Sequence, residues 1–371
     1  MNRAARLIPL FAAAAALFVA ACGSDNNSSS SSSSSSSGGS KTEAKAGKVG
    51  VLLPDSKSSV RWETVDRPFL KKAFGDAGVE ADIQNAEGDK STQQQQAEQM
   101  ITNGAKVLLL VNLDSGSGAA IEANAESRGV KVIDYDRLTL GGSADYYVSF
   151  NNVKVGELQG QGLDSCMQKS GGKNIVFLNG SPTDNNATLF KQGAHSVLDP
   201  KIDSGTYKKV AEQDVPDWDN QKALTIFEQM LQKQGNKIDG VLAANDGLGN
   251  AAVSALKARK LKQIPVTGQD ATLQGVQNVL TGDQCMTVYK PIAGEADAAA
   301  KLAIALAKGQ TPPAPADKTN NQKKDVPSVL LTPVGVTKDT VKDYLKEVDF
   351  PKAEDICAGK VAEACAANGV Q

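Results

Sequence analysis

Residues 240–270, GVLAANDGLGNAAVSALKARKLKQIPVTGQD, decide the fold class of this chain. Gly240–Ala244 is a short apolar run, and Leu248–Leu261 carries apolar residues at helical spacing. Pro265–Gly268 is a second short run that suits a strand. A strand, a helix and another strand in this order indicate a parallel βαβ unit.

The same cycle recurs in both directions from this segment. The other runs expected to form strands are Val49–Leu53, Val79–Gln84, Lys106–Val111, Lys131–Tyr135, Tyr146–Phe150, Asn174–Leu178, Tyr207–Ala211 and Met286–Tyr289. Helical periodicity separates most of them, for example at Thr92–Asn103, Val153–Gln168 and Gln221–Gln234. Strands too apolar for simple alternation, separated by helices, predict an α/β protein with doubly wound parallel sheets.

These strands are too many for one comfortable sheet, so we expect two α/β domains joined by a hinge, with a cleft between them. The chain is expected to cross at Phe150-Asn151-Asn152 and to return near Lys290-Pro291. The expected organisation is a signal peptide at 1–21, a Ser-rich tether at 22–46, a first domain of 47–150 plus 292–340, a second domain of 151–291, and a C-terminal helix with a Cys-bearing tail at 341–371.

Composition excludes several classes of function. Among 371 residues, 40% are hydrophobic, and 40 Lys and Arg face 42 Asp and Glu. This balance gives none of the strong positive field of a nucleic-acid-binding protein. The chain holds 1 histidine, His195, and 5 cysteines without a CxxC pair, which leaves too few ligands for a typical metal site. We therefore expect neither a metal site nor most hydrolase chemistry, and the binding function that the sequence blocks below imply needs no cofactor and no enzymatic activity.

The N-terminus has the layout of an export signal. Arg3 and Arg6 precede the apolar stretch Leu7–Ala20, and Cys22 follows two small residues. This pattern resembles the lipobox of bacterial lipoproteins, and an ordinary cleaved signal is the alternative. The serine run Ser28–Ser37 cannot form a core and is expected to be a disordered tether. We expect a protein on the extracytoplasmic face of the cell membrane, held there by a lipid on Cys22 alone.

The four remaining cysteines allow three pairings. Cys357 and Cys365 lie close together in the tail, whereas Cys166 and Cys285 are far apart in the sequence. Export permits oxidation. We favour Cys357 with Cys365 and Cys166 with Cys285, and buried free thiols are the alternative.

Polar residues follow most of the expected strands, where parallel sheets place their ligand sites. Asp136-Arg137, Asn245-Asp246, Gln269-Asp270 and Lys290 are such residues. An Asp or Asn there also caps a following helix, which is the better interpretation for any one of them alone. As a set, together with the only two tryptophans, Trp62 and Trp218, they favour a sugar site. Flat rings suit the C–H faces of a pyranose, and planar bidentate groups suit neighbouring hydroxyls.

Two other functions deserve comparison. Gly247-Leu248-Gly249-Asn250-Ala251-Ala252 matches GxGxxA after a strand, and Asp270 could contact a ribose, as in an NAD-dependent dehydrogenase. Two residues intervene between the strand and Gly247, however, and the match comes late in the chain. The effector domain of a sugar-responsive regulator is the other alternative, but an export signal stands where a helix-turn-helix is expected.

Several sequence blocks resemble the D-xylose-binding proteins of bacterial ABC sugar importers, over roughly Lys48–Lys342. The blocks are Val60-Arg61-Trp62, Tyr135-Asp136-Arg137, Ser149-Phe150-Asn151-Asn152, Val155-Gly156-Glu157-Leu158-Gln159, Gly180-Ser181-Pro182-Thr183-Asp184-Asn185-Asn186-Ala187, Ala244-Asn245-Asp246, Gly268-Gln269-Asp270, Met286-Thr287-Val288-Tyr289-Lys290-Pro291 and Asp325-Val326-Pro327-Ser328.

The resemblance implies a type 1 periplasmic binding protein fold and a monomer that closes by a hinge over a monosaccharide, D-xylose or a related aldopyranose. It also implies an ABC permease as partner. Carried over motif by motif, the sugar ligands it implies are Arg61, Trp62, Asp136, Arg137, Asn186, Trp218, Asn245, Asp270 and Lys290.

Overall fold

The computed structural model of the chain describes residues 46–348 and 351–370. The expected signal peptide, Cys22 and nearly all of the expected tether lie outside them. The strands are β1 (Lys48–Leu53), β2 (Ala81–Asn85), β3 (Ala105–Leu110), β4 (Lys131–Tyr135), β5 (Tyr146–Phe150), β6 (Asn174–Asn179), β7 (Lys208–Asp214), β8 (Gly240–Ala243), β9 (Met286–Tyr289), β10 (Asp317–Asn320), β11 (Asp325–Leu331) and β12 (Val334–Thr337).

The α-helices are α1 (Arg67–Asp76), α2 (Lys90–Thr102), α3 (Ser115–Ser127), α4 (Asn152–Ser170), α5 (Asn185–Asp203), α6 (Asn220–Lys233), α7 (Asp246–Ala258), α8 (Leu273–Thr281), α9 (Ile292–Ala307), α10 (Val341–Glu347), α11 (Ala353–Ile356) and α12 (Ala362–Ala367). Three short helical turns complete them, η1 (Trp62–Asp66), η2 (Pro216–Trp218) and η3 (Gly359–Val361). In the described part of the chain, no helix has the length and apolar character needed to cross a membrane.

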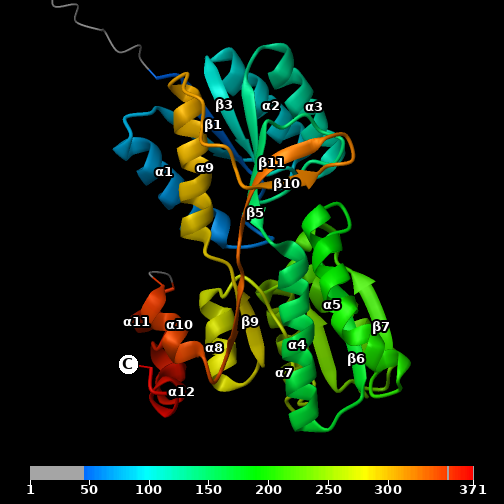
Figure 1. Cartoon of the computed structure of the whole chain (residues 1–371). Coiled ribbons are helices and arrows are strands. Elements are labelled where there is room, and N and C mark those ends of the chain that lie inside the picture. The colour runs from blue at the N-terminus through cyan, green and yellow to red at the C-terminus, as the bar shows by residue number, and fades with distance from the viewer. Residues whose placement is uncertain (1–45, 349–350, 371) are drawn as a thin grey trace, which may run out of the picture. The chain divides into compact units, whose positions relative to one another are not determined.

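The first lobe contains a seven-stranded sheet in the order β10-β11-β5-β4-β3-β1-β2. All neighbours pair in parallel except β10, which is antiparallel to β11. Alternate residues of a strand face opposite sides, so Val51 packs with α1 and α9, whereas Leu52 packs with α2 and α3. Figure 1 shows these two helical layers on either side of the sheet. The predicted α/β class is confirmed.

The second lobe is built around the parallel strands β7-β6-β8. The segment predicted as the strand Pro265–Gly268 is irregular here and forms only a single bridge, Val266 to Val241. Its backbone nevertheless bonds to both neighbours, since Thr267 N donates to Val241 O and Cys285 N donates to Val266 O. The segment therefore joins β8 to the antiparallel pair β9 and β12. Helices α6 and α7 contribute to one core of this lobe, and α4 and α5 contribute both to that core and to a second one.

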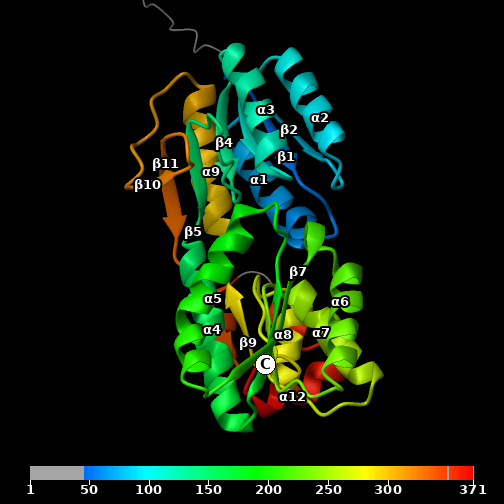
Figure 2. The ribbon, with the colours of Figure 1, turned by 90° about the vertical axis from the view of Figure 1, so that its right-hand side faces the viewer.

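The chain passes between the lobes after β5, after β9 and after β11 (Figures 1 and 2). The first two passages match the expected crossings at Asn151 and Pro291. We expected the first domain to continue to residue 340, but β12 pairs with β9 in the second lobe. The last passage therefore falls between Leu331 and Val334. Strands β10, β11 and β12 were not predicted from the sequence.

Both favoured disulfides are present. One joins Cys166, near the end of α4, to Cys285, just before β9. The other joins Cys357 to Cys365 in the C-terminal tail. The tail packs against α8 through a small apolar core that includes Val276, Leu280 and Ile356. All four bonded cysteines therefore belong to the second lobe or to the tail packed against it.

Candidate functional site

The nine residues predicted to bind a sugar all line one small cavity between the lobes, with a volume of about 30 Å³. The first lobe supplies Arg61, Trp62, Asp136 and Arg137, the second lobe supplies Asn186, Trp218, Asn245 and Asp270, and Lys290 lies at the second crossing. All nine are buried. So many buried polar groups around one cavity mark a site for a polar molecule.

Arg61 organises the first-lobe side of the cavity. Its Nε and Nη2 donate to the two carboxylate oxygens of Asp66, at 2.9 and 2.8 Å. Its Nη1 donates to Asp136 Oδ2 at 2.9 Å, and its Nη2 also reaches Glu295 Oε2 at 2.6 Å. Burial acts to lower the pKa of Arg61, but the three carboxylates raise it well above its ordinary value. Burial raises the pKa of Glu295 well above its ordinary value.

Asp136 is the centre of the polar network. Its backbone has a φ of 63°, in the left-handed region that costs a non-glycine residue strain, and it directly follows β4. Its carbonyl oxygen accepts hydrogen bonds from Ser149 Oγ and from Asn186 Nδ2, at 2.7 and 2.9 Å. Burial opposes ionisation of Asp136, but Lys290 and Arg61 outweigh it and lower the pKa of this carboxyl. Asp136 is therefore held as a carboxylate.

Lys290 and Asp270 connect this network to the second lobe. Lys290 Nζ lies 3.1 Å from Asp270 Oδ1 and 3.7 Å from Asp136 Oδ2. The buried Lys290 keeps its charge, since the two carboxylates overcome the desolvation and raise its pKa. Ser59 Oγ donates across the cleft to Asp270 Oδ2 at 3.2 Å. Asp270 has a φ of 92°, so a second site residue holds a strained backbone.

Asn245 shows that capping and cleft contacts are not exclusive. Its Oδ1 accepts from Leu248 N at 2.9 Å and caps α7, as its position after a strand predicts. Its Nδ2 donates across the cleft to Ser58 O at 3.4 Å. The same side chain therefore fixes a helix and faces the other lobe.

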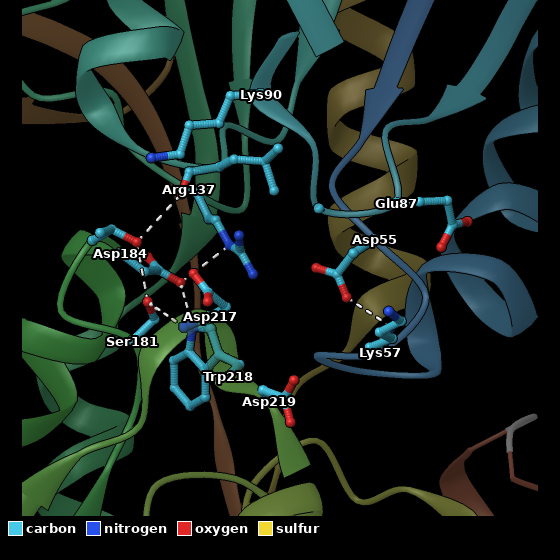
Figure 3. A pocket seen from close by; sticks show the side chains of 13 residues that line it. Asp55, Lys57, Glu87, Lys90, Arg137, Ser181, Asp184, Asp217, Trp218 and Asp219 are labelled. Carbon is cyan, nitrogen blue, oxygen red and sulfur yellow. Dashed lines mark hydrogen bonds and ion pairs between the residues drawn. The ribbon is translucent and has the colours of Figure 1, made fainter. Parts of the chain in front are cut away.

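Trp218 is held by Asp184 and by a glycine. Its Nε1 donates to Asp184 Oδ2 at 3.1 Å, and Asp184 also lies 3.1 Å from Arg137 Nε of the first lobe (Figure 3). Gly180 lies against the ring, where a Cβ atom would overlap the indole. Phe190 packs edge-on to Trp218, with ring centroids 6.3 Å apart. The position of the ring is therefore set by these neighbours rather than by the short turn η2, in which Trp218 lies.

Five lining residues lie outside the nine predicted ligands, namely Ser58, Ser59, Asp184, Phe190 and Gln269. Gln269 was noted from the sequence only as a polar residue after an expected strand, and spacing could have identified Phe190. Phe190 lies four residues after Asn186 on α5 and so shares its helix face. Gln269 adjoins Asp270, and its buried Oε1 has no hydrogen-bond partner among the described residues. Ser58 and Ser59 carry no comparable signal, because the loop before Arg61 has no regular period.

The glycine motif at Gly247 does not form a dinucleotide site. A Cβ atom at Gly247 would overlap the side chain of Asn220, and one at Gly249 would lie 2.9 Å from Thr267 O. These glycines therefore allow close packing of α7 against its neighbours. The dehydrogenase alternative loses the feature on which it was based.

Comparisons with known proteins agree with this geometry. Residues 49–311 match the periplasmic binding protein domain. The D-xylose-binding periplasmic protein of Escherichia coli strain K12 is 40% identical over 315 residues, covering 84% of this chain and 93% of that protein. A multiple sugar-binding periplasmic receptor of Rhizobium radiobacter is 36% identical over 331 residues, covering 84% of this chain and 93% of that receptor.

Solved structures give the same result. A solute-binding protein of an ABC transporter from Clostridium phytofermentans, with bound β-D-glucose, superposes with a TM-score of 0.77 at 32% identity. The match covers 83% of this chain and 99% of that one. The resemblance seen in the sequence blocks is confirmed, and the relatives are binding proteins for transport rather than enzymes. The chain belongs to the periplasmic binding protein family and has its type 1 fold.

Proposed function

We propose that this protein binds a monosaccharide, D-xylose in the first place, between its lobes and delivers it to an ABC permease. One observation carries the proposal. Carboxylate, guanidinium, ammonium and amide groups from both lobes converge on one buried cavity that the only two tryptophans also line. Sugar hydroxyls both donate and accept hydrogen bonds, so they match such a mixed set. The sugars named for the relatives support the same class of ligand.

In the structure, many polar groups of the cavity bond to one another. Asn186 Nδ2, for example, lies 3.1 Å from Asp136 Oδ1, and Lys290 lies 3.1 Å from Asp270. A cavity of about 30 Å³ has room for one or two waters. A sugar must therefore enter as the lobes separate, and its hydroxyls then replace these contacts. Because ligand contacts from both lobes exist only in the closed state, binding favours closure.

The N-terminal sequence supports the place of action. Acylation at Cys22 would hold a monomer at the extracytoplasmic face of the membrane, with the serine run as a tether. A Cys22→Ser variant is expected to leave the membrane fraction of the native host and to keep its sugar affinity. Wild-type protein found in the aqueous phase of a detergent extraction would contradict the anchor.

A ligand panel tests the function. Thermal shift followed by titration calorimetry with xylose, ribose, glucose and NAD is expected to give saturable binding to at least xylose. Binding raises the melting temperature, since the ligand binds only the folded state. NAD is expected to give neither heat nor a shift. Absence of binding to every monosaccharide would remove the proposed function, whereas binding of glucose alone would change the named sugar.

A further inference from the structure

A second cavity, larger than the first, adjoins the candidate sugar site. This outer chamber has a volume of about 190 Å³ and shares Arg137, Asp184 and Trp218 with the inner cavity (Figure 3). Its other lining residues are Asp55, Lys57, Glu87, Gly88, Lys90, Leu113, Ser181, Thr183, Asp217 and Asp219. Figure 3 shows side chains of both lobes around the chamber.

The outer chamber exists while the lobes are in contact. Thr183 Oγ1 of the second lobe donates to Leu113 O of the first at 3.4 Å. Asn220 Nδ2 donates to Lys57 O at 3.3 Å. Both bonds run between the lobes and involve lining residues of the chamber. The chamber therefore lies between the two lobes and is not space that their contact removes.

Its loop from Asp55 to Ser58 is also fixed. Asp55 is buried, and its Oδ1 accepts from the backbone N–H groups of Lys57 and Ser58, at 2.7 and 2.5 Å. Its Oδ2 accepts from Ser58 Oγ at 2.8 Å. Since Ser58 itself lines the inner cavity, this loop forms a shared wall between the two spaces.

The size of the chamber suits a six-membered ring. A cavity of about 150 Å³ is enough to hold benzene in a protein interior, and the outer chamber is larger, at about 190 Å³. Trp218 belongs to both spaces and offers a flat apolar surface. Ser181 and Thr183 add hydroxyls that can donate and accept.

The charges of the chamber select for a neutral ring. Five carboxylates line it, from Asp55, Glu87, Asp184, Asp217 and Asp219, against the three cations Lys57, Lys90 and Arg137. Two of these charges have partners outside the lining, since Lys90 lies 2.7 Å from Asp114 and Asp217 lies 2.6 Å from Lys222. The remaining carboxylates of Asp55, Glu87, Asp184 and Asp219 still outnumber Lys57 and Arg137. Carboxylates accept hydrogen bonds from hydroxyls but repel another carboxylate.

We propose that the outer chamber is a second sugar subsite, so that the protein takes a neutral disaccharide with one ring in the inner cavity and the other in the outer chamber. This inference rests on the proposed monosaccharide function and extends its substrate class. It assigns the inner cavity to the ring recognised by Asp136, Asp270 and Lys290, and the outer chamber to the glycosidically linked ring. A ring that carries a carboxylate is excluded from the outer chamber.

Titration calorimetry with xylose, xylobiose and a glucuronic-acid-bearing xylose disaccharide tests the proposal. Wild-type protein is expected to bind xylobiose within about tenfold of its xylose affinity, and the acidic disaccharide at least tenfold more weakly than xylobiose. Leu113→Trp places a large ring in the outer chamber alone. It is expected to weaken xylobiose at least tenfold and to leave xylose within about twofold, which also shows that the variant is folded. The matched variant Leu113→Ala is expected to keep both affinities.

The other outcomes overturn either the second subsite or the proposed function. Binding of xylose without xylobiose, or equal xylobiose affinity in wild type and Leu113→Trp, overturns the second subsite and leaves the proposed function intact. Equal loss of xylose and xylobiose in Leu113→Trp also overturns it, since the monosaccharide would then occupy the outer chamber. Absence of binding to all sugars by the wild type overturns the proposed function itself.

Discussion

The two lobes fix their halves of the site in different ways. In the first lobe, Arg61 holds three buried carboxylates by ion pairs of 2.6–2.9 Å. The second lobe is braced by the Cys166–Cys285 disulfide, and its site residues are held by separate hydrogen bonds such as that of Trp218 to Asp184. This difference implies that one change near Arg61 disturbs both stability and binding. A change at Asp270, a second-lobe ligand, is expected to disturb binding more than stability.

The largest effect is expected where the second lobe is braced. Replacing both Cys166 and Cys285 by serine opens a loop with a sequence separation of 119. The loop-entropy argument gives a loss of about 4 to 5 kcal/mol in the free energy of unfolding. The matched pair Cys357→Ser with Cys365→Ser opens a separation of only 8, for which the same argument gives about 2 to 3 kcal/mol. Chemical denaturation checks both, and a greater loss from the short loop would contradict the argument.

The next largest loss of stability is expected at the ion pairs of Arg61 in the first lobe. Arg61→Ala leaves Asp66, Asp136 and Glu295 buried without their shared cation. Removing one partner of a buried ion pair costs about 3–5 kcal/mol, and sugar binding is expected to be lost as well. As a control, Lys72→Ala breaks an exposed pair with Asp76 in α1 and is expected to cost less than about 1 kcal/mol. Urea unfolding of both variants measures the two losses in unfolding free energy. Similar losses would show that the ion pairs of Arg61 stabilise the fold no more than an exposed pair does.

A smaller effect, mainly on affinity, is expected at Asp270. Asp270→Ala removes the acceptor for Ser59 and the partner of Lys290 from a closed, desolvated site. Hydrogen bonds to a charged group contribute about 1.5–3 kcal/mol, which is roughly ten- to over a hundredfold in the dissociation constant. Asp297→Ala, at an exposed pair with Lys301, serves as the control. Calorimetry with xylose is the measurement, and unchanged affinity in a folded Asp270→Ala variant would remove this residue from the site.

The smallest effect concerns pH and again belongs to the second lobe. His195 lies between Glu212 and Asp199, with Nε2 and Nδ1 at 3.0 and 2.7 Å from their carboxylates. The contact with Glu212, then that with Asp199, raises the pKa of His195 despite partial burial. The folded state therefore holds this proton more tightly than the unfolded state. The resulting stability is complete below the ordinary pKa of about 6.5 and is lost as the pH rises through the raised value.

Replacing this residue by glutamine isolates the effect. The wild-type advantage over His195→Gln in unfolding free energy is expected to decrease as the pH rises above about 6.5 and through the raised pKa. Because His195 is the only histidine, a proton NMR titration of its ring gives the folded-state pKa directly. A wild-type advantage that grows with pH would have the wrong sign.

Local pattern accounts for the features that were predicted correctly. Alternation of apolar runs and helical periods depends on near neighbours, and it identified β1 to β9. It also predicted a strand around Val266, where the structure has an irregular segment. Strand β11 contains Pro327, and its partner β5 lies far away in the sequence. Polar β10 pairs only at the edge of the sheet. Strand β11 depends on a distant partner and β10 pairs only with β11, so local pattern did not find either strand.

The site residues likewise divide into those that the sequence could predict and those that it could not. Residues that follow strands converge because parallel strands end at a common edge, and the resemblance supplied the rest of the nine. Asp184 was missed because an aspartate before a helix suggests only a cap, and it does accept from Asn186 N at 2.9 Å. Its contact with Trp218 joins residues far apart in the sequence of the second lobe, and its contact with Arg137 depends on how the lobes meet. Sequence spacing contains no information on that contact.

Intrinsic fluorescence tests the central claim, that one sugar contacts both lobes, most directly. Trp62 of the first lobe and Trp218 of the second are the only tryptophans, and both line the inner cavity. Trp62→Phe leaves a reporter in the second lobe alone, and Trp218→Phe leaves one in the first lobe alone. Titration with xylose is expected to change the emission of both variants saturably, each with the dissociation constant that calorimetry gives for that variant. A response from only one of them, or from neither, would contradict a sugar held between the lobes.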